Sequence, residues 1–200
     1  MSKPIPHFSL PTIFVLFGVT GDLVRTKILP SLFGLYAKKL LPATLQIYGF
    51  SRRDLTDATL RDFFRTILVE GTASANVAEQ IREDFLNCLF YIKGDFEDKN
   101  AYQHLAQALG KTDAGWSSCS NKFFYLAVAP GNYQTILLGL KASGLADPCD
   151  PKDGVNRIVI EKPFGSDLKS AQELDMFLGK LFKEDQIYRI DHYLVKENVR

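Results

Sequence analysis

One stretch near the start of the chain, residues 13–30, restricts the possible folds more than any other; it reads IFVLFGVTGDLVRTKILP. Its first five residues are apolar and include β-branched and aromatic side chains, as in a parallel strand that is buried on both faces. Gly18 and Gly21 then allow a sharp turn and leave no Cβ to block a ligand. A helix follows, so its free N–H groups and the positive end of its dipole would face an anion such as a diphosphate.

The spacing of the glycines separates two kinds of nucleotide-binding turn. The dinucleotide fingerprint is G-x-G-x-x-G or a relative of it, and this chain has G-x-x-G, with Val24 where a third glycine can stand. On this motif alone, a strand, turn and helix that bind no ligand remain an alternative. A P-loop is excluded, because Leu23 occupies the place of its second glycine.

Length and composition fit a single globular domain. The chain has 200 residues, of which 46% are hydrophobic and 24% are charged, so it is neither disordered nor membrane-spanning by composition. A net charge of +1 argues against a nucleic-acid partner, since such domains carry a basic excess. The first residues lack the pattern of a secretory signal, and no apolar run approaches membrane length, so we expect no membrane partner.

The cysteines give no motif. Cys88, Cys119 and Cys149 are odd in number, far apart and without CxxC spacing or a nearby histidine cluster. They predict neither a disulfide framework nor a zinc site. We therefore expect no metal and a reducing, cytoplasmic setting.

Strand-like and helix-like segments alternate along the chain. Strands are predicted at residues 13–17, 45–50, 89–93, 121–128, 157–161 and 186–190. Helices are predicted at residues 23–41, 56–69, 76–87, 98–109, 132–141 and 166–182, the first of them bent or restarted at Pro30. Strands and helices that alternate at this spacing favour a parallel sheet with right-handed crossovers. The predicted fold is α/β: a single domain with a Rossmann-type, doubly wound, mostly parallel sheet.

The residues that follow the second predicted strand bear on the choice of coenzyme. NAD-binding folds place an Asp or Glu about 20 residues past the glycines, where it binds the ribose 2′-hydroxyl. Here Ser51, Arg52 and Arg53 follow the strand. A carboxylate would repel a 2′-phosphate, whereas a guanidinium can bind it with two parallel hydrogen bonds. The arginines therefore favour NADP; a solvated loop is the alternative reading of two arginines after an arbitrary strand.

Two later segments carry ionisable groups just past predicted strand ends: EKPFG at residues 161–165 and RIDHYLVKE at residues 189–197. Together with GVTGDL at residues 18–23, in this order and separation, they resemble the glucose-6-phosphate dehydrogenase family. The resemblance covers essentially the whole chain and corresponds to the amino-terminal, coenzyme-binding half of that family. It implies that residues 1–200 are an NADP-binding domain without the carboxy-terminal substrate and oligomerisation domain. We therefore expect a fragment or a truncated gene product, with oligomer contacts mainly in the missing half.

The resemblance also implies which residues contact the coenzyme. The turn would bind the NADP diphosphate with Thr20 and Arg25 near the phosphates, and Arg52 stands where the family has its 2′-phosphate arginine. The full set of implied cofactor contacts is Gly18, Thr20, Gly21, Asp22, Leu23, Arg25, Arg52, Tyr125 and Lys162. For Tyr125, packing in the sheet is the favoured reading.

The activity that the resemblance implies is oxidation of glucose 6-phosphate to 6-phosphogluconolactone in the pentose phosphate pathway, with hydride transfer to NADP. Lys162 would contact both substrate and coenzyme, and His192, Tyr193 and Lys196 would bind the sugar phosphate. Asp191 would orient a catalytic histidine that acts as general base. In the family that histidine lies beyond the residues present here, so the chain alone is expected to be inactive.

Two departures and two alternatives accompany the resemblance. Val195 stands where the family has a glycine and Ala129 where it commonly has a proline. A non-catalytic module that binds NADP without turnover is the main alternative. A short-chain dehydrogenase is rejected, because it needs a lysine four residues after a tyrosine, and Tyr193 and Lys196 are one residue short of that spacing.

Overall fold

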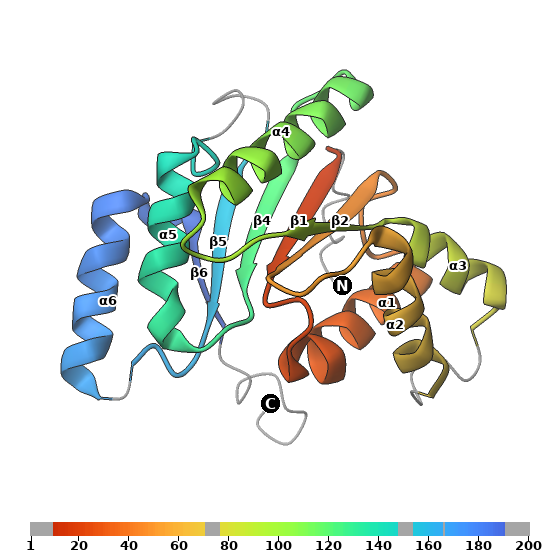
Figure 1. Ribbon diagram of the computed structural model, residues 1–200, viewed down its shortest axis with the longest axis horizontal. Helices are drawn as coiled ribbons and strands as arrows, with labels where there is room; N and C mark the ends of the chain where they lie inside the picture. The colour runs from red at the N-terminus through yellow and green to blue at the C-terminus, as the bar shows by residue number, and fades with distance from the viewer. Residues whose placement is uncertain (1–9, 71–76, 148–153, 166, 191–200) are drawn as a thin grey trace, which may run out of the picture.

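The computed structural model describes residues 10–70, 77–147, 154–165 and 167–190 of the chain. At its centre lies one sheet whose strands are all parallel, in the order β3-β2-β1-β4-β5-β6 (Figure 1). The strands are β1 (Thr12–Phe17), β2 (Leu45–Ser51), β3 (Leu89–Lys93), β4 (Asn121–Leu126), β5 (Asn156–Glu161) and β6 (Ile187–Ile190). This strand order is that of the Rossmann fold, so the predicted fold class is confirmed.

Helices pack against both faces of the sheet. The helices are α1 (Leu29–Ala37), α2 (Asp57–Glu70), α3 (Glu79–Asn87), α4 (Lys99–Trp116), α5 (Tyr133–Ala142) and α6 (Leu168–Leu181). Residues of α1, α2 and α3 share one apolar core with the sheet, and residues of α4, α5 and α6 share the other. Figure 1 shows the two groups on different sides of the molecule, as in a doubly wound sheet.

The central strand β1 is buried from both sides. Ile13, Val15 and Phe17 belong to the core beneath α4, α5 and α6, whereas Leu16 belongs to the core beneath α1, α2 and α3. Successive side chains of a strand point to opposite faces, so this alternation is the direct result of the strand's pleat. Five aliphatic and aromatic residues in a row are what a strand with two covered faces requires.

The first helical run changes its register just before Pro30, as the predicted restart at that residue requires. A π-helical turn, η1 (Val24–Ile28), leads directly into α1, and the Leu29 N–H donates to the carbonyl of Val24, five residues back. Pro30 has no N–H with which to continue an α-helical ladder, so it is tolerated only near the start of a helix. The proline therefore occupies the first turn of α1.

Some predicted boundaries are wrong. The helix predicted at residues 98–109 continues to Trp116, and the strand predicted to reach residue 128 ends at Leu126. Helix α4 continues past Gly110 because its last turns have tertiary partners: Asp113 forms a 2.7 Å ion pair with the buried Lys122. Long-range contacts of this kind override local helix propensity.

The predicted absence of disulfide bonds is wrong for one cysteine. Cys119 is disulfide-bonded, while Cys88 is a free thiol. The described residues contain no group of three or more His, Cys, Asp or Glu side chains that could hold a metal ion. Among the helices of these ranges, none has the length and apolarity needed to cross a membrane. The cytoplasmic setting and the domain assignment stay predictions.

Candidate coenzyme site

The turn after β1 fits only glycine at residue 18. Gly18 has a φ of +76°, and its N–H donates to the carbonyl of Phe50 at 2.9 Å. A Cβ at this position would lie 2.6 Å from the carbonyl oxygen of Ala127 and 2.7 Å from Cγ1 of Val128. The sequence therefore needs glycine here twice over, for the left-handed backbone and for the close approach to the end of β4.

Several N–H groups of this turn are available to a ligand. The N–H of Gly21 donates to the carbonyl of Gly18 at 2.8 Å. The N–H groups of Thr20, Asp22 and Leu23 have no acceptor among the residues that the structure describes. Unpaired N–H groups at the start of a helical run, with the positive end of its dipole behind them, form an anion site.

The pairing of the strands places the loops that follow four of them at the same edge of the sheet. Phe17 pairs with Phe50 on one side and with Leu126 on the other, and Ser51 pairs with Lys93. The segments that follow β1, β2, β3 and β4 therefore leave the sheet side by side. The gap between β1 and β4 is also where the strand order changes direction, which is where doubly wound sheets bind ligands.

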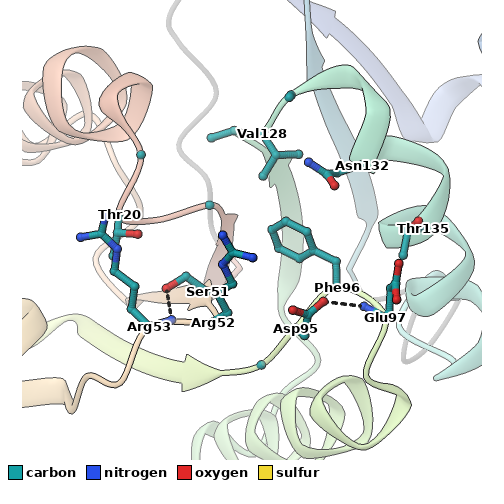
Figure 2. A pocket seen from close by; sticks show the side chains of 15 residues that line it. Thr20, Ser51, Arg52, Arg53, Asp95, Phe96, Glu97, Val128, Asn132 and Thr135 are labelled. Atoms are coloured by element: carbon teal, nitrogen blue, oxygen red, sulfur yellow. Dashed lines mark hydrogen bonds between the residues drawn. The ribbon is translucent and has the colours of Figure 1, made fainter.

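A cavity of about 630 Å³ lies at this edge (Figure 2). Its lining is Gly18, Thr20 and Gly21 after β1, residues 51–53 at the end of β2, residues 94–97 after β3, residues 127–129 after β4, and Asn132 and Thr135 at the start of α5. This volume is in the range of cofactor sites.

The side of the cavity next to β2 carries positive charge. Arg52 and Arg53 are both exposed, and Figure 2 shows Arg52 pointing into the space between the glycine turn and Phe96. The loop after the neighbouring strand β3 adds the carboxylates of Asp95 and Glu97, and the Asp95 carboxylate accepts the N–H of Glu97 at 3.2 Å. The cavity lining thus combines two arginines after β2 with acidic and aromatic side chains after β3.

Five of the predicted coenzyme contacts, Lys162 among them, have side chains that do not line this cavity. Asp22 and Arg25 form an exposed ion pair at 3.0 Å. Leu23 packs against the core beneath α1. The Tyr125 hydroxyl donates to the carboxylate of Glu161, and burial raises the pKa of Tyr125 so that it stays a donor. The coenzyme roles of these residues stay predictions, and for Asp22 and Leu23 the backbone N–H is the available contact.

Lys162 lies at the same edge of the sheet but two strands away from β1. It follows β5, its side chain is exposed, and its N–H donates to the carbonyl of Ile190 at 3.2 Å. The buried Glu161 next to it is held by two tyrosines: Tyr125 donates to the carboxylate and Tyr133 donates to the carbonyl at 3.3 Å. The strand end that carries Lys162 is therefore anchored, although Lys162 does not line the 630 Å³ cavity.

The remaining predicted residues, Asp191, His192, Tyr193 and Lys196, lie outside the described ranges, and so does Val195. Strand β6 ends at Ile190, which pairs with Glu161. The chain therefore leaves β6 beside the strand end that carries Lys162.

Sequence reasoning missed part of the cavity lining. Phe96 and Glu97 follow β3, and Asn132 and Thr135 lie near the start of α5. The available signal was their place after strand ends that meet at one edge of a parallel sheet. No motif marks them.

The loop of residues 94–97 is fixed at the start of α4, which gives a testable stability effect. The carboxylate of Asp98 accepts the N–H of Asn100 at 2.9 Å and so caps the helix. We expect Asp98→Ala to lower the free energy of unfolding by about 1 kcal/mol, measured by urea denaturation. Asp98→Asn keeps an acceptor and should stay close to the wild type. Equal losses in the two variants would show that the cap does not stabilise α4.

Comparison with known proteins identifies the family. The sequence model described as "Glucose-6-phosphate dehydrogenase, NAD binding domain" matches residues 15–200. The chain belongs to the glucose-6-phosphate dehydrogenase family. Its resemblance to that family, inferred above from three motifs, is thereby confirmed.

Individual relatives agree with the family assignment. The chain is 38% identical over 200 residues to glucose-6-phosphate 1-dehydrogenase 2 of Mycobacterium tuberculosis, covering 99% of this chain and 38% of that protein. It is 38% identical over 195 residues to glucose-6-phosphate 1-dehydrogenase of Caenorhabditis elegans, covering 96% of this chain and 36% of the relative. The chain thus spans less than two fifths of the length of these relatives.

A solved structure supports both the fold and the family. A glucose-6-phosphate dehydrogenase in complex with its substrate glucose 6-phosphate superposes with a TM-score of 0.83 at 32% identity, covering 98% of this chain and 39% of the other. The family domain that matches is a NAD-binding domain, so the cofactor class is a nicotinamide dinucleotide. The residues present fit such a group, because a glycine turn with unpaired N–H groups and two arginines line one cavity.

Proposed function

We propose that these residues form the NADP-binding part of a dehydrogenase that oxidises glucose 6-phosphate to 6-phosphogluconolactone. The observation that carries the proposal is that the Gly18 turn and Arg52 line one cavity at the gap between β1 and β4. Family membership supports the reaction, and the relatives named above are glucose-6-phosphate dehydrogenases.

The choice of NADP rests on where charge lies in the cavity. The N–H groups of the turn would receive the diphosphate, and the guanidinium of Arg52 would receive the 2′-phosphate with paired hydrogen bonds. The carboxylates of Asp95 and Glu97, in the loop after β3, would repel a phosphate. The 2′-phosphate is therefore assigned to the arginine side of the cavity. NAD lacks this phosphate, so Arg52 would add less to the affinity for NAD than to the affinity for NADP.

The sugar would lie beyond the cavity, toward the end of β5. There the ammonium of Lys162 would donate to a sugar hydroxyl, from a strand end that Tyr125 and Tyr133 hold through Glu161. NADP, when bound, supplies the acceptor for the hydride that leaves C1 of the sugar. The proton of the C1 hydroxyl goes to a base, for which the family resemblance implies a histidine beyond residue 200, oriented by Asp191. The products balance as lactone, reduced coenzyme and one proton.

Calorimetric titration with NADP and NAD tests the proposed coenzyme. We expect NADP to bind about 10-fold or more tightly than NAD, the gain expected from one charge-assisted interaction with the 2′-phosphate. Equal affinity for the two coenzymes would contradict the assignment of Arg52.

The reaction is tested by following the absorbance of the reduced nicotinamide after addition of glucose 6-phosphate. Residues 1–200 alone are expected to bind NADP without turnover, because loss of a general base costs about 10²- to 10⁴-fold in rate. Turnover at the rate of a complete dehydrogenase would overturn the assignment of the base to a later segment.

A further inference from the structure

A single tyrosine on the neighbouring strand β3 holds the segment that carries the two arginines. The hydroxyl oxygen of Tyr91 lies 2.8 Å from the Ser51 Oγ, 2.8 Å from the Ser51 carbonyl and 2.6 Å from the Arg53 carbonyl. These atoms precede and follow Arg52. One hydroxyl therefore lies within hydrogen-bonding distance of polar groups on both sides of Arg52.

Strand β3 makes two further contacts with the chain that follows residues 51–53. The N–H of Tyr91 donates to Oδ1 of Asp57 at 2.7 Å, and Asp57 is the first residue of α2. Lys93 forms a 3.0 Å ion pair with Asp54. That pair is exposed, so it contributes little, and the half-buried hydroxyl of Tyr91 is the stronger tie. Burial raises the pKa of Tyr91, which keeps its hydroxyl protonated.

Counting protons assigns the hydrogen bonds. The Tyr91 hydroxyl has one hydrogen, which it can give to one of the two carbonyls, and the carbonyl of Arg53 is the nearer. The lone pairs of Tyr91 can then accept the hydroxyl hydrogen of Ser51. The Ser51 Oγ in turn accepts the N–H of Arg53 at 3.4 Å, drawn as a dashed line in Figure 2. These bonds form a closed ring in which removal of the Tyr91 hydroxyl frees two of the loop's polar groups.

Tyr91 does not itself line the cavity, whereas Ser51, Arg52 and Arg53 do. We infer that Tyr91 is a positioning residue for coenzyme selectivity: its hydroxyl holds residues 51–53 so that Arg52 meets the phosphate on the ribose 2′-oxygen. This inference rests on the proposed binding of NADP. It goes beyond it by assigning part of the preference for NADP over NAD to a side chain that touches neither coenzyme.

The variant Tyr91→Phe keeps the aromatic ring of the side chain and removes only its hydroxyl. We expect its affinity for NADP to fall about 3- to 10-fold, the equivalent of one hydrogen bond, with its affinity for NAD changed less than about twofold. Placed on an Arg52→Ala background, the same change should leave NADP affinity where Arg52→Ala alone puts it, because the hydroxyl acts through Arg52. Both affinities are measured by calorimetric titration.

Tyr48→Phe is the matched control. Tyr48 lies on β2, and its hydroxyl bonds to Thr112 at 2.7 Å and to Gln46 at 3.1 Å, away from the arginine segment. It should lose stability comparably while keeping the wild-type ratio of NADP to NAD affinity.

The outcomes separate the two claims. If the wild type prefers NADP and Tyr91→Phe keeps that preference, or weakens both coenzymes equally, the positioning role is wrong and the proposed function stands. If the wild type shows no preference, the proposed binding of NADP fails and the positioning role falls with it. A loss confined to NADP that disappears on the Arg52→Ala background supports the inference.

Discussion

Gly18→Ala is expected to weaken binding of both NADP and NAD by about 100-fold or more. The new Cβ would lie 2.6 Å from the carbonyl oxygen of Ala127, a backbone atom that cannot move without shifting β4. The left-handed backbone at Gly18 would add a cost of about 1–2 kcal/mol. The turn must therefore change shape, and its N–H groups would no longer converge on the diphosphate. Each charge-assisted hydrogen bond contributes about 1.5–3 kcal/mol, so loss of two accounts for the expected change.

Gly144→Ala provides a control with the same backbone angle. Gly144 also has a φ of +76°, but a Cβ there would meet nothing within 4 Å, and the residue lies after α5, outside the cavity lining. We expect it to lose stability through its backbone conformation alone and to bind both coenzymes normally. Equal loss of binding in Gly18→Ala and Gly144→Ala would show that general destabilisation explains the effect.

Arg52→Ala is expected to weaken NADP about 10- to 100-fold and NAD by less than about twofold. A guanidinium that receives the 2′-phosphate with two hydrogen bonds has no counterpart for the 2′-hydroxyl of NAD, so only one coenzyme should lose affinity. The measurement is a pair of calorimetric titrations with the two coenzymes. Equal weakening of both would sink the assignment of Arg52 to the 2′-phosphate.

Arg52→Lys separates charge from geometry in the same experiment. Lysine keeps the positive charge but cannot offer two parallel donors, so its affinity for NADP should fall between wild type and Arg52→Ala. Raising the salt concentration should narrow the differences among the three proteins, because Arg52 is exposed and its charge is screened. A lysine variant as weak as the alanine variant would indicate that the forked geometry accounts for the whole contribution.

Much of the fold could be predicted because its strands carry local signals. The apolar run before Gly18 predicted a strand at residues 13–17, and β1 is Thr12–Phe17. Arg52 could be placed near the glycine turn because the carboxyl ends of neighbouring parallel strands meet at one edge. Pro30 predicted a change in the first helical run, and the change occurs just before it.

The rest depends on contacts between distant parts of the chain, which periodicity does not report. Helix α4 continues past Gly110 and Gly115, although glycine favours the end of a helix. It does so because Thr112 and Asp113 bond to side chains on strands β2 and β4. Tyr91 reaches Ser51 across 40 residues of sequence, so no local motif predicts it.

The side chain of Arg25 shows that even a contact between residues close in sequence was not predicted. It pairs with Asp22 three residues back, and neither side chain lines the cavity. A family motif predicts which residues lie near a ligand. It does not predict which way each side chain points.

A crystal structure of the protein with NADP tests the central claim most directly. The predicted result places the diphosphate against the N–H groups of residues 20–23 and the 2′-phosphate within hydrogen-bonding distance of the Arg52 guanidinium. A coenzyme bound elsewhere on the molecule, or one whose 2′-phosphate makes no contact with Arg52, would contradict the account.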